Sequence, residues 1–130
     1  VNDSSDNVLF MGFVTNVIET IQSFDIQVFP SHLEGTPNTL FEALAVGNCI
    51  VASDTDGQAE ILIHNKNALV YPAGNVNALS TELQTVLQDS TLRKRLKHNA
   101  LETGRNFDGN KTVERMQNIY STIMTETGNR

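Results

Sequence analysis

The chain has 130 residues, 39% of them hydrophobic and 18% charged, which is typical of one globular domain and excludes an intrinsically disordered chain. No apolar stretch approaches the ~20 residues of a membrane span, the amino terminus has no signal-peptide pattern, and the single cysteine excludes an internal disulfide. The net charge is -6 and residues 1–65 contain no Lys or Arg, which argues against a nucleic-acid partner.

The predicted elements alternate between strands and helices along most of the chain. In order, they are a strand at 8–11, a helix at 14–24, a strand at 26–29, a helix at 39–47, a strand at 49–52, a loop with one helical turn at 55–67, a strand at 68–71, and helices at 75–89, 90–107 and 110–126. Gly47 is expected to end its helix, and Asn75 and Ser90 are expected to be N-caps. Cys49 opens a continuous apolar run, so we expect it to be a buried strand residue.

This alternation predicts an α/β fold, specifically a doubly wound parallel sheet of the Rossmann-like kind. Nucleotide-binding sheets of this kind have five or six strands, whereas four are predicted here. The chain also lacks an initiating Met. We therefore expect residues 1–130 to be a single partial domain without its first strand and helix, ending in helices at about 90–127.

The segment 30–47 carries most of the chemical signal, because it leaves a strand and enters a helix at the carboxyl edge of the sheet, where such sheets bind ligands. Thr36 is predicted to be the N-cap and Pro37 the first helical residue, where its missing N–H costs nothing. The next free N–H groups would belong to Asn38, Thr39 and Leu40. A helix end of this kind can bind a diphosphate without any Lys or Arg.

Two glutamates, Glu34 and Glu42, flank that helix start. Glu42 is expected to share a helix face with Asn38. The sheet-facing side of the helix is expected to contain Leu40, Phe41, Leu44 and Ala45. Ionised carboxylates accept hydrogen bonds from sugar hydroxyls, so the pair favours a hydroxyl-rich ligand, although two glutamates at this spacing also occur as solvated surface charges.

Residues 30–62 resemble the glycosyltransferase group 1 family, a large family of retaining, two-domain GT-B enzymes. The resemblance rests on Glu34-Gly35, Pro37-Asn38, Glu42-Ala43, Ala52-Ser53-Asp54, Gly57, Glu60 and Pro72-Ala73-Gly74. It extends over roughly residues 6–125 and implies that the chain is the carboxyl-terminal, nucleotide-sugar-binding half of a GT-B fold. One departure is Ala59, which stands where the family often has proline.

The resemblance also implies a role for each site residue. Glu34 would contact the transferred sugar as the catalytic carboxylate, and Glu42 would bind the ribose. The backbone of Gly35, Asn38, Thr39 and Leu40 would hold the diphosphate. Phe13 and Val14 would lie near the base.

The reaction implied is transfer of a sugar from a nucleoside diphosphate sugar with retention, without a cofactor or a metal. The acceptor-binding domain and the cations for the leaving diphosphate would lie upstream of Val1, and any membrane association would come from those missing parts. The resemblance further implies a cytoplasmic location. His32, His64 and His98 have no metal-ligand spacing, and His32 is expected to be an exposed or packing residue.

Two alternatives remain open from the sequence. The first is a nucleotide-sugar-binding module without activity of its own, because no acceptor site is present in the chain. The second is a receiver-type signalling domain, which is also acidic and doubly wound. The absence of an acid pair after the first predicted strand and of a Lys after the last one argues against it.

Overall fold

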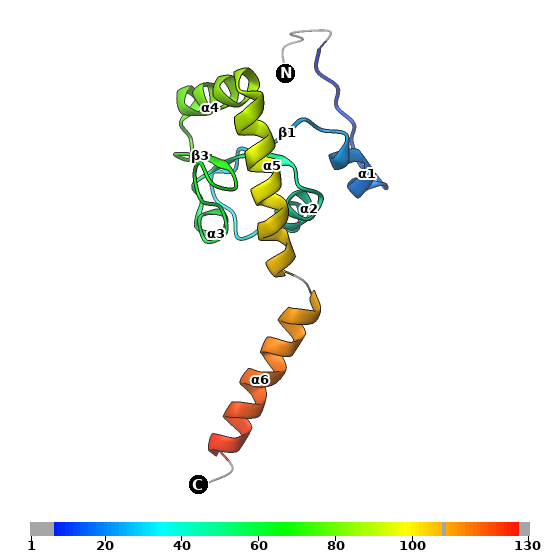
Figure 1. Cartoon of the computed structure of the whole chain (residues 1–130), viewed down its shortest axis with the longest axis vertical. Coiled ribbons are helices and arrows are strands. Elements are labelled where there is room, and N and C mark those ends of the chain that lie inside the picture. The colour runs from blue at the N-terminus through cyan, green and yellow to red at the C-terminus, as the bar shows by residue number, and fades with distance from the viewer. Residues whose placement is uncertain (1–6, 108, 128–130) are drawn as a thin grey trace.

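The computed structural model describes residues 7–107 and 109–127 (Figure 1). Its strands are β1 (Ile26–Phe29), β2 (Cys49–Ser53) and β3 (Leu69–Tyr71). Its helices are α1 (Val17–Gln22), α2 (Asn38–Val46), α3 (Asp56–Ala59), α4 (Val76–Gln88), α5 (Ser90–Gly104) and α6 (Gly109–Thr127), with a 3-10 turn, η1 (Arg105–Phe107), between the last two. The order of elements matches the predicted alternation from 14 onwards.

The three strands form one parallel sheet in the order β1-β2-β3. Ile26 lies opposite Cys49, and Val51 lies opposite Leu69. Neighbouring parallel strands need a crossover connection, and α2 makes the one between β1 and β2. The strands predicted at 26–29 and 49–52 therefore pair in parallel, as the predicted parallel sheet requires.

Apolar side chains cover both faces of this sheet. One cluster joins the sheet to α2 and contains Phe29, Leu40, Leu44, Ile50 and Ala52. The other joins the opposite face to α4 and α5 and contains Cys49, Val51, Leu69, Tyr71, Val86 and Leu96. Every residue of β2 is buried, as expected for a central strand with helices on both sides. The doubly wound α/β prediction is thus confirmed.

The predicted strand at 8–11 is wrong. These residues have no regular secondary structure, and the side chains of Val8, Leu9, Phe10 and Met11 are exposed. A strand is held by the backbone of a neighbour, and the described sheet places no strand beside this segment. Its apolar composition resembles that of a buried strand, but composition alone supplies no partner.

The helix boundaries follow the local capping chemistry. Asn75 caps α4 as predicted, since its side chain accepts a hydrogen bond of 3.0 Å from the N–H of Ala78. The prediction that Ser90 caps α5 is wrong by one residue. The cap is Asp89, whose Oδ1 atom accepts a hydrogen bond of 2.8 Å from the N–H of Leu92. Asp and Ser are comparable N-caps, and the negative charge of Asp89 also interacts favourably with the helix dipole. Gly47 ends α2 in the left-handed conformation, with φ 72°, as predicted.

The last helices differ in how they relate to the sheet. The helix predicted at 90–107 ends at Gly104 and continues as the 3-10 turn. The helix predicted at 110–126 is confirmed as α6, which runs away from the sheet in Figure 1. Within the described residues, no helix is long and apolar enough to span a bilayer.

Candidate functional site

The site is built around the amino-terminal end of α2. Pro37 stands at the N-cap position, with φ -73° and ψ 141°, and Asn38 is the first helical residue, so both lie one position earlier in the helix than predicted. The proline ring sets φ near this value, which directs the chain into the helix. The side chain of Thr36 makes no cap hydrogen bond, so the prediction that it is the N-cap is wrong.

Two backbone donors remain free at this helix end. The N–H of Leu40 donates to the carbonyl of Pro37 at 3.0 Å, so the prediction of three free groups is wrong for Leu40. Asn38 and Thr39 have no hydrogen-bond partner for their N–H groups within 7–107 and 109–127. Two outward-facing N–H groups and the helix dipole are suited to hold an anion.

A short chain of hydroxyl groups ties Glu34 to the sheet. The hydroxyl of Ser53, at the end of β2, is fully buried and donates to the carbonyl of Ser31 at 2.7 Å. The hydroxyl of Ser31 in turn donates to a carboxylate oxygen of Glu34. The position of Glu34 is therefore set by the strand end rather than by its own loop alone.

Thr36 and Gly57 connect the same loop to α3. The hydroxyl of Thr36 donates to the carbonyl of Gly57 at 3.0 Å. A side chain at Gly57 would overlap the backbone of Gly35 and Thr36, so only glycine permits this approach. Gly57 and Ser53 appear in the sequence-based prediction only as parts of the resemblance. The sequence predicts no role for Ser31, and it predicts the Thr36 hydroxyl as a helix cap and not as a partner of Gly57. A hydroxyl two or more residues from a motif glutamate gives no recognisable spacing of its own.

Glu42 lies on the first turns of α2 and is half-buried. Its Oε2 atom is fully buried, and no group in the described part of the chain bonds to it. A buried carboxylate oxygen without a partner costs free energy, so a ligand hydroxyl that reaches this half-buried carboxylate would stabilise it.

The sheet-facing side of α2 differs slightly from the prediction. Leu40 and Leu44 are fully buried, as expected, and so is Ala43, which the prediction omitted. Phe41 is half-buried and its ring lies 5.1 Å from that of Phe107. Ala45 is exposed, so its assignment to the sheet side is wrong. The η1 turn supplies the partner for Phe41, and helical spacing within α2 gives no information on that turn.

The proposed base-binding residues lie elsewhere. Phe13 and Val14 belong to the irregular segment before α1, and the Phe13 side chain is 94% exposed. Gly12 precedes them with φ 62°. The structure therefore brings Glu34, Gly35, Asn38, Thr39 and Glu42 together on one loop and helix start, whereas Phe13 and Val14 stay on a separate exposed segment.

Two remaining features bear on chemistry near the sheet. Burial raises the pKa of Cys49 from 9.0 to about 11, and Arg93 and Lys97 lower it by less, so the thiol stays neutral near pH 7. Within the described residues there is no group of three or more His, Cys, Asp or Glu side chains that could hold a metal ion.

Comparisons with known proteins agree on one family. The family profile described as "Glycosyl transferases group 1" matches residues 3–103. The chain is 31% identical over 121 residues to N,N'-diacetylbacillosaminyl-diphospho-undecaprenol alpha-1,3-N-acetylgalactosaminyltransferase of Campylobacter jejuni, covering 93% of this chain and 32% of that protein. It is also 29% identical over 121 residues to the putative glycosyltransferase EpsD of Bacillus subtilis, again covering 32% of the relative. The chain thus spans about a third of the length of these relatives.

Solved structures share the fold. Anabaena HepE in complex with UDP-glucose superimposes with a TM-score of 0.79 at 23% identity, covering 92% of this chain and 33% of that one. The C-terminal domain of LpcC, a glycosyl transferase group 1 family protein from Francisella tularensis, gives a TM-score of 0.67 at 21% identity, covering 77% and 51%. The chain therefore has the fold of the carboxyl-terminal half of a GT-B protein.

Proposed function

The chain belongs to the glycosyl transferases group 1 family, and from this premise we propose that it binds a nucleoside diphosphate sugar at the start of α2, as the donor part of a retaining glycosyltransferase. Membership of this family removes the receiver-type alternative. The same proposal has three further parts. The whole protein would contain an acceptor-binding domain, that domain's side of the protein would supply the cations that neutralise the leaving diphosphate, and the protein would be cytoplasmic.

The observation that carries the proposal is the arrangement of unpaired polar groups around α2. The N–H groups of Asn38 and Thr39 are free donors, and the Oε2 atom of Glu42 is a buried acceptor without a partner among the described residues. A diphosphate would accept from the two N–H groups, and a ribose hydroxyl would donate to Glu42. The donors and the acceptor lie within two turns of the same helix, so a single ligand could contact both.

Glu34 would act at the other end of the ligand. It precedes the helix end that would hold the diphosphate, whereas Glu42 follows it, so the two carboxylates would face the sugar and the ribose respectively. The hydroxyl of Ser31 holds one oxygen of Glu34 and leaves the other for a sugar hydroxyl. As the sugar–phosphate bond breaks, the helix end would stabilise the negative charge on the leaving diphosphate. No metal or cofactor is part of this proposal.

The proposal is tested by titrating UDP, the nucleotide in solved HepE complexes, into the chain and two variants. We expect Glu42→Ala to weaken binding about ten- to a hundredfold, because a charge-assisted hydrogen bond contributes about 1.5–3 kcal/mol. We expect Glu34→Ala to leave UDP binding nearly unchanged, because UDP lacks the transferred sugar that Glu34 would contact. Amide chemical shifts in NMR spectra can follow even millimolar binding.

Glu114→Ala is the matched control, because Glu114 is an exposed glutamate on α6, away from the sheet edge (Figure 1). Its UDP affinity should equal that of the unaltered chain. Equal losses in Glu34→Ala and Glu42→Ala, or no loss in either, would show that the two carboxylates do not divide the ligand as proposed. The absence of any UDP-dependent shift at Asn38 and Thr39 would show that α2 is not the nucleotide site.

A further inference from the structure

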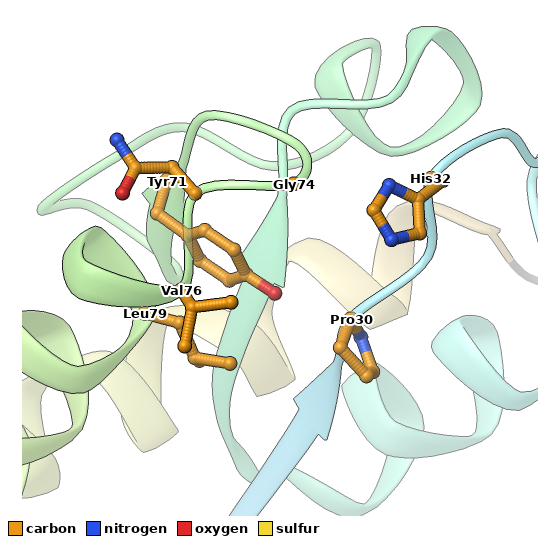
Figure 2. Close-up of a pocket in the computed structure, with 7 residues that line it drawn as sticks. Pro30, His32, Tyr71, Gly74, Val76 and Leu79 are labelled. Carbon is orange, nitrogen blue, oxygen red and sulfur yellow. The ribbon is translucent and has the colours of Figure 1, made fainter.

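A second hollow lies at the same sheet edge, between the ends of β1 and β3 and the start of α4 (Figure 2). It encloses about 360 Å³ including its open mouth and is lined by Pro30, His32, Tyr71, Gly74, Asn75, Val76 and Leu79. None of these residues takes part in the nucleotide site proposed at α2. His32, however, is only two residues from Glu34, so the pocket adjoins the end of the ligand where the sugar would lie.

The polar centre of this pocket is the hydroxyl of Tyr71. The residue is 4% exposed, and within the described residues no group forms a hydrogen bond with the hydroxyl. Figure 2 shows the ring entering the pocket from β3, so that the hydroxyl ends between Val76 and Leu79 on one side and His32 and Pro30 on the other. Burial raises the pKa of Tyr71, so the hydroxyl keeps its proton and can donate a hydrogen bond. An unpaired hydroxyl in such a place gains a bond only from a ligand or from water.

The remaining walls are mainly apolar. Pro30, Val76 and Leu79 supply carbon surface, and the imidazole of His32 faces the space from the opposite loop (Figure 2). Gly74 has φ 79°, a left-handed backbone conformation that favours glycine, and a Cβ atom there would lie 3.4 Å from the His32 ring. The pocket thus offers a hydrogen-bond donor, a second polar group and an apolar floor, which suits a small group with one carbonyl oxygen and one methyl.

We propose that this pocket takes the acetamido group of a 2-acetamido donor sugar. The proposal rests on the donor-binding function above and specifies its substrate class. The carbonyl oxygen would accept from Tyr71, the methyl group would lie on Val76 and Leu79, and the amide N–H would face His32. A hydroxyl at the same sugar position has no methyl group to lie on Val76 and Leu79 and no carbonyl oxygen to accept from Tyr71.

The test compares two pairs of ligands that differ only in this group: UDP-N-acetylgalactosamine against UDP-galactose, and UDP-N-acetylglucosamine against UDP-glucose. The affinity ratio within a pair isolates the acetamido group from the nucleotide. We expect the acetamido sugar of at least one pair to bind more tightly and to shift the ring signals of Tyr71 and His32 in NMR spectra. Tyr71→Phe should lower that ratio about three- to tenfold, because one neutral hydrogen bond is lost.

Tyr120→Phe is the matched control, since Tyr120 is an exposed tyrosine on α6 and the same hydroxyl is removed there. It should leave the ratio unchanged. Val76→Phe gives an independent variant, because Val76 is 75% exposed at the start of α4 and a larger ring there would fill the pocket. It should bring the ratio close to one without unfolding the chain.

The outcomes separate this proposal from the one on which it rests. Suppose that UDP binding depends on Glu42. Equal affinities within both ligand pairs, or an affinity ratio that Tyr71→Phe does not change, would then overturn the acetamido site alone. If no UDP compound binds, the donor function fails, and the methyl glycosides of N-acetylglucosamine and glucose then test the pocket directly. A Tyr71 shift with the free acetamido glycoside but not with bound UDP-acetamido sugars would assign the pocket to an acceptor and overturn the donor proposal.

Discussion

Gly57 is the residue on which the shape of the loop before α2 depends most directly. It lies in α3, and its backbone touches the backbone of Gly35 and Thr36, so that no side chain fits between the two segments. The Thr36 hydroxyl adds a hydrogen bond across the same contact. Both contacts lie within three residues of Asn38, whose N–H is one of the free donors.

We expect Gly57→Ala to destabilise the chain by about 1–3 kcal/mol, because the added methyl group would overlap backbone atoms that cannot rotate away. Thermal unfolding followed by circular dichroism measures this change. Gly35→Ala is the control, since a methyl group at Gly35 meets nothing within 4 Å and its φ is not in the left-handed region. An unchanged melting temperature in Gly57→Ala would mean that the two segments are not packed as described.

The residues that cap the two ends of the helices show why some single-residue predictions failed. Asn75 and Gly47 act as predicted, because an amide cap and a left-handed glycine are determined within one or two residues. The cap of α5 is Asp89 and not the predicted Ser90. Both residue types cap helices, and the pattern of apolar residues cannot separate two such neighbours. Thr36 was a reasonable N-cap, but its hydroxyl bonds to Gly57, which is 21 residues away in sequence.

Among the elements, α2 both presents the candidate site and packs on the sheet. Its buried residues Leu40, Ala43 and Leu44 lie in the cluster with Phe29 and Ile50. The helix therefore holds its free amino-terminal end in place through packing on the opposite side. Helix propensity alone would not fix so short a helix, since isolated helices of this length are marginal in water.

We expect Leu44→Ala to lower the free energy of unfolding by about 2–5 kcal/mol, because it leaves a cavity in the core. Asn38→Ala, at an exposed position of the same helix, should change it by less than about 0.5 kcal/mol. Chemical denaturation of the two variants gives both values. A larger loss for Asn38→Ala than for Leu44→Ala would contradict the assignment of the two faces of α2.

At the scale of the whole molecule, the described sheet has three strands, and the apolar segment 8–11 lies outside it. Its side chains are exposed together with that of Phe13. The chain spans about a third of the length of these relatives.

In the chain as described, the backbone amides of 8–11 should exchange with deuterium far faster than those of Ile50, Val51 and Ala52 in β2. The reason is that β2 is bonded on both sides and fully buried, whereas 8–11 has no neighbouring strand. Mass spectrometry after short labelling times distinguishes the two segments. Strong protection of 8–11 would show that the sequence-based strand prediction is correct after all.

Three features could be predicted from the sequence alone: the order of elements from α1 onwards, the parallel sheet, and the two candidate carboxylates. They depend on local information, namely apolar periodicity, a left-handed glycine, and a motif that runs from Glu34 to Ala43. The roles of the site residues stay predictions until ligand binding is measured.

The three-dimensional structure was needed to identify which polar groups of the described residues are unpaired. It shows that Leu40 uses its N–H, that Glu42 keeps an unpaired buried oxygen, and that Ser53 holds the loop of Glu34 through Ser31. It also brings Tyr71 and His32, 39 positions apart, to opposite sides of one pocket. The physical reason is that hydrogen bonding and burial depend on neighbours that are distant in sequence, which periodicity and spacing along the chain do not record.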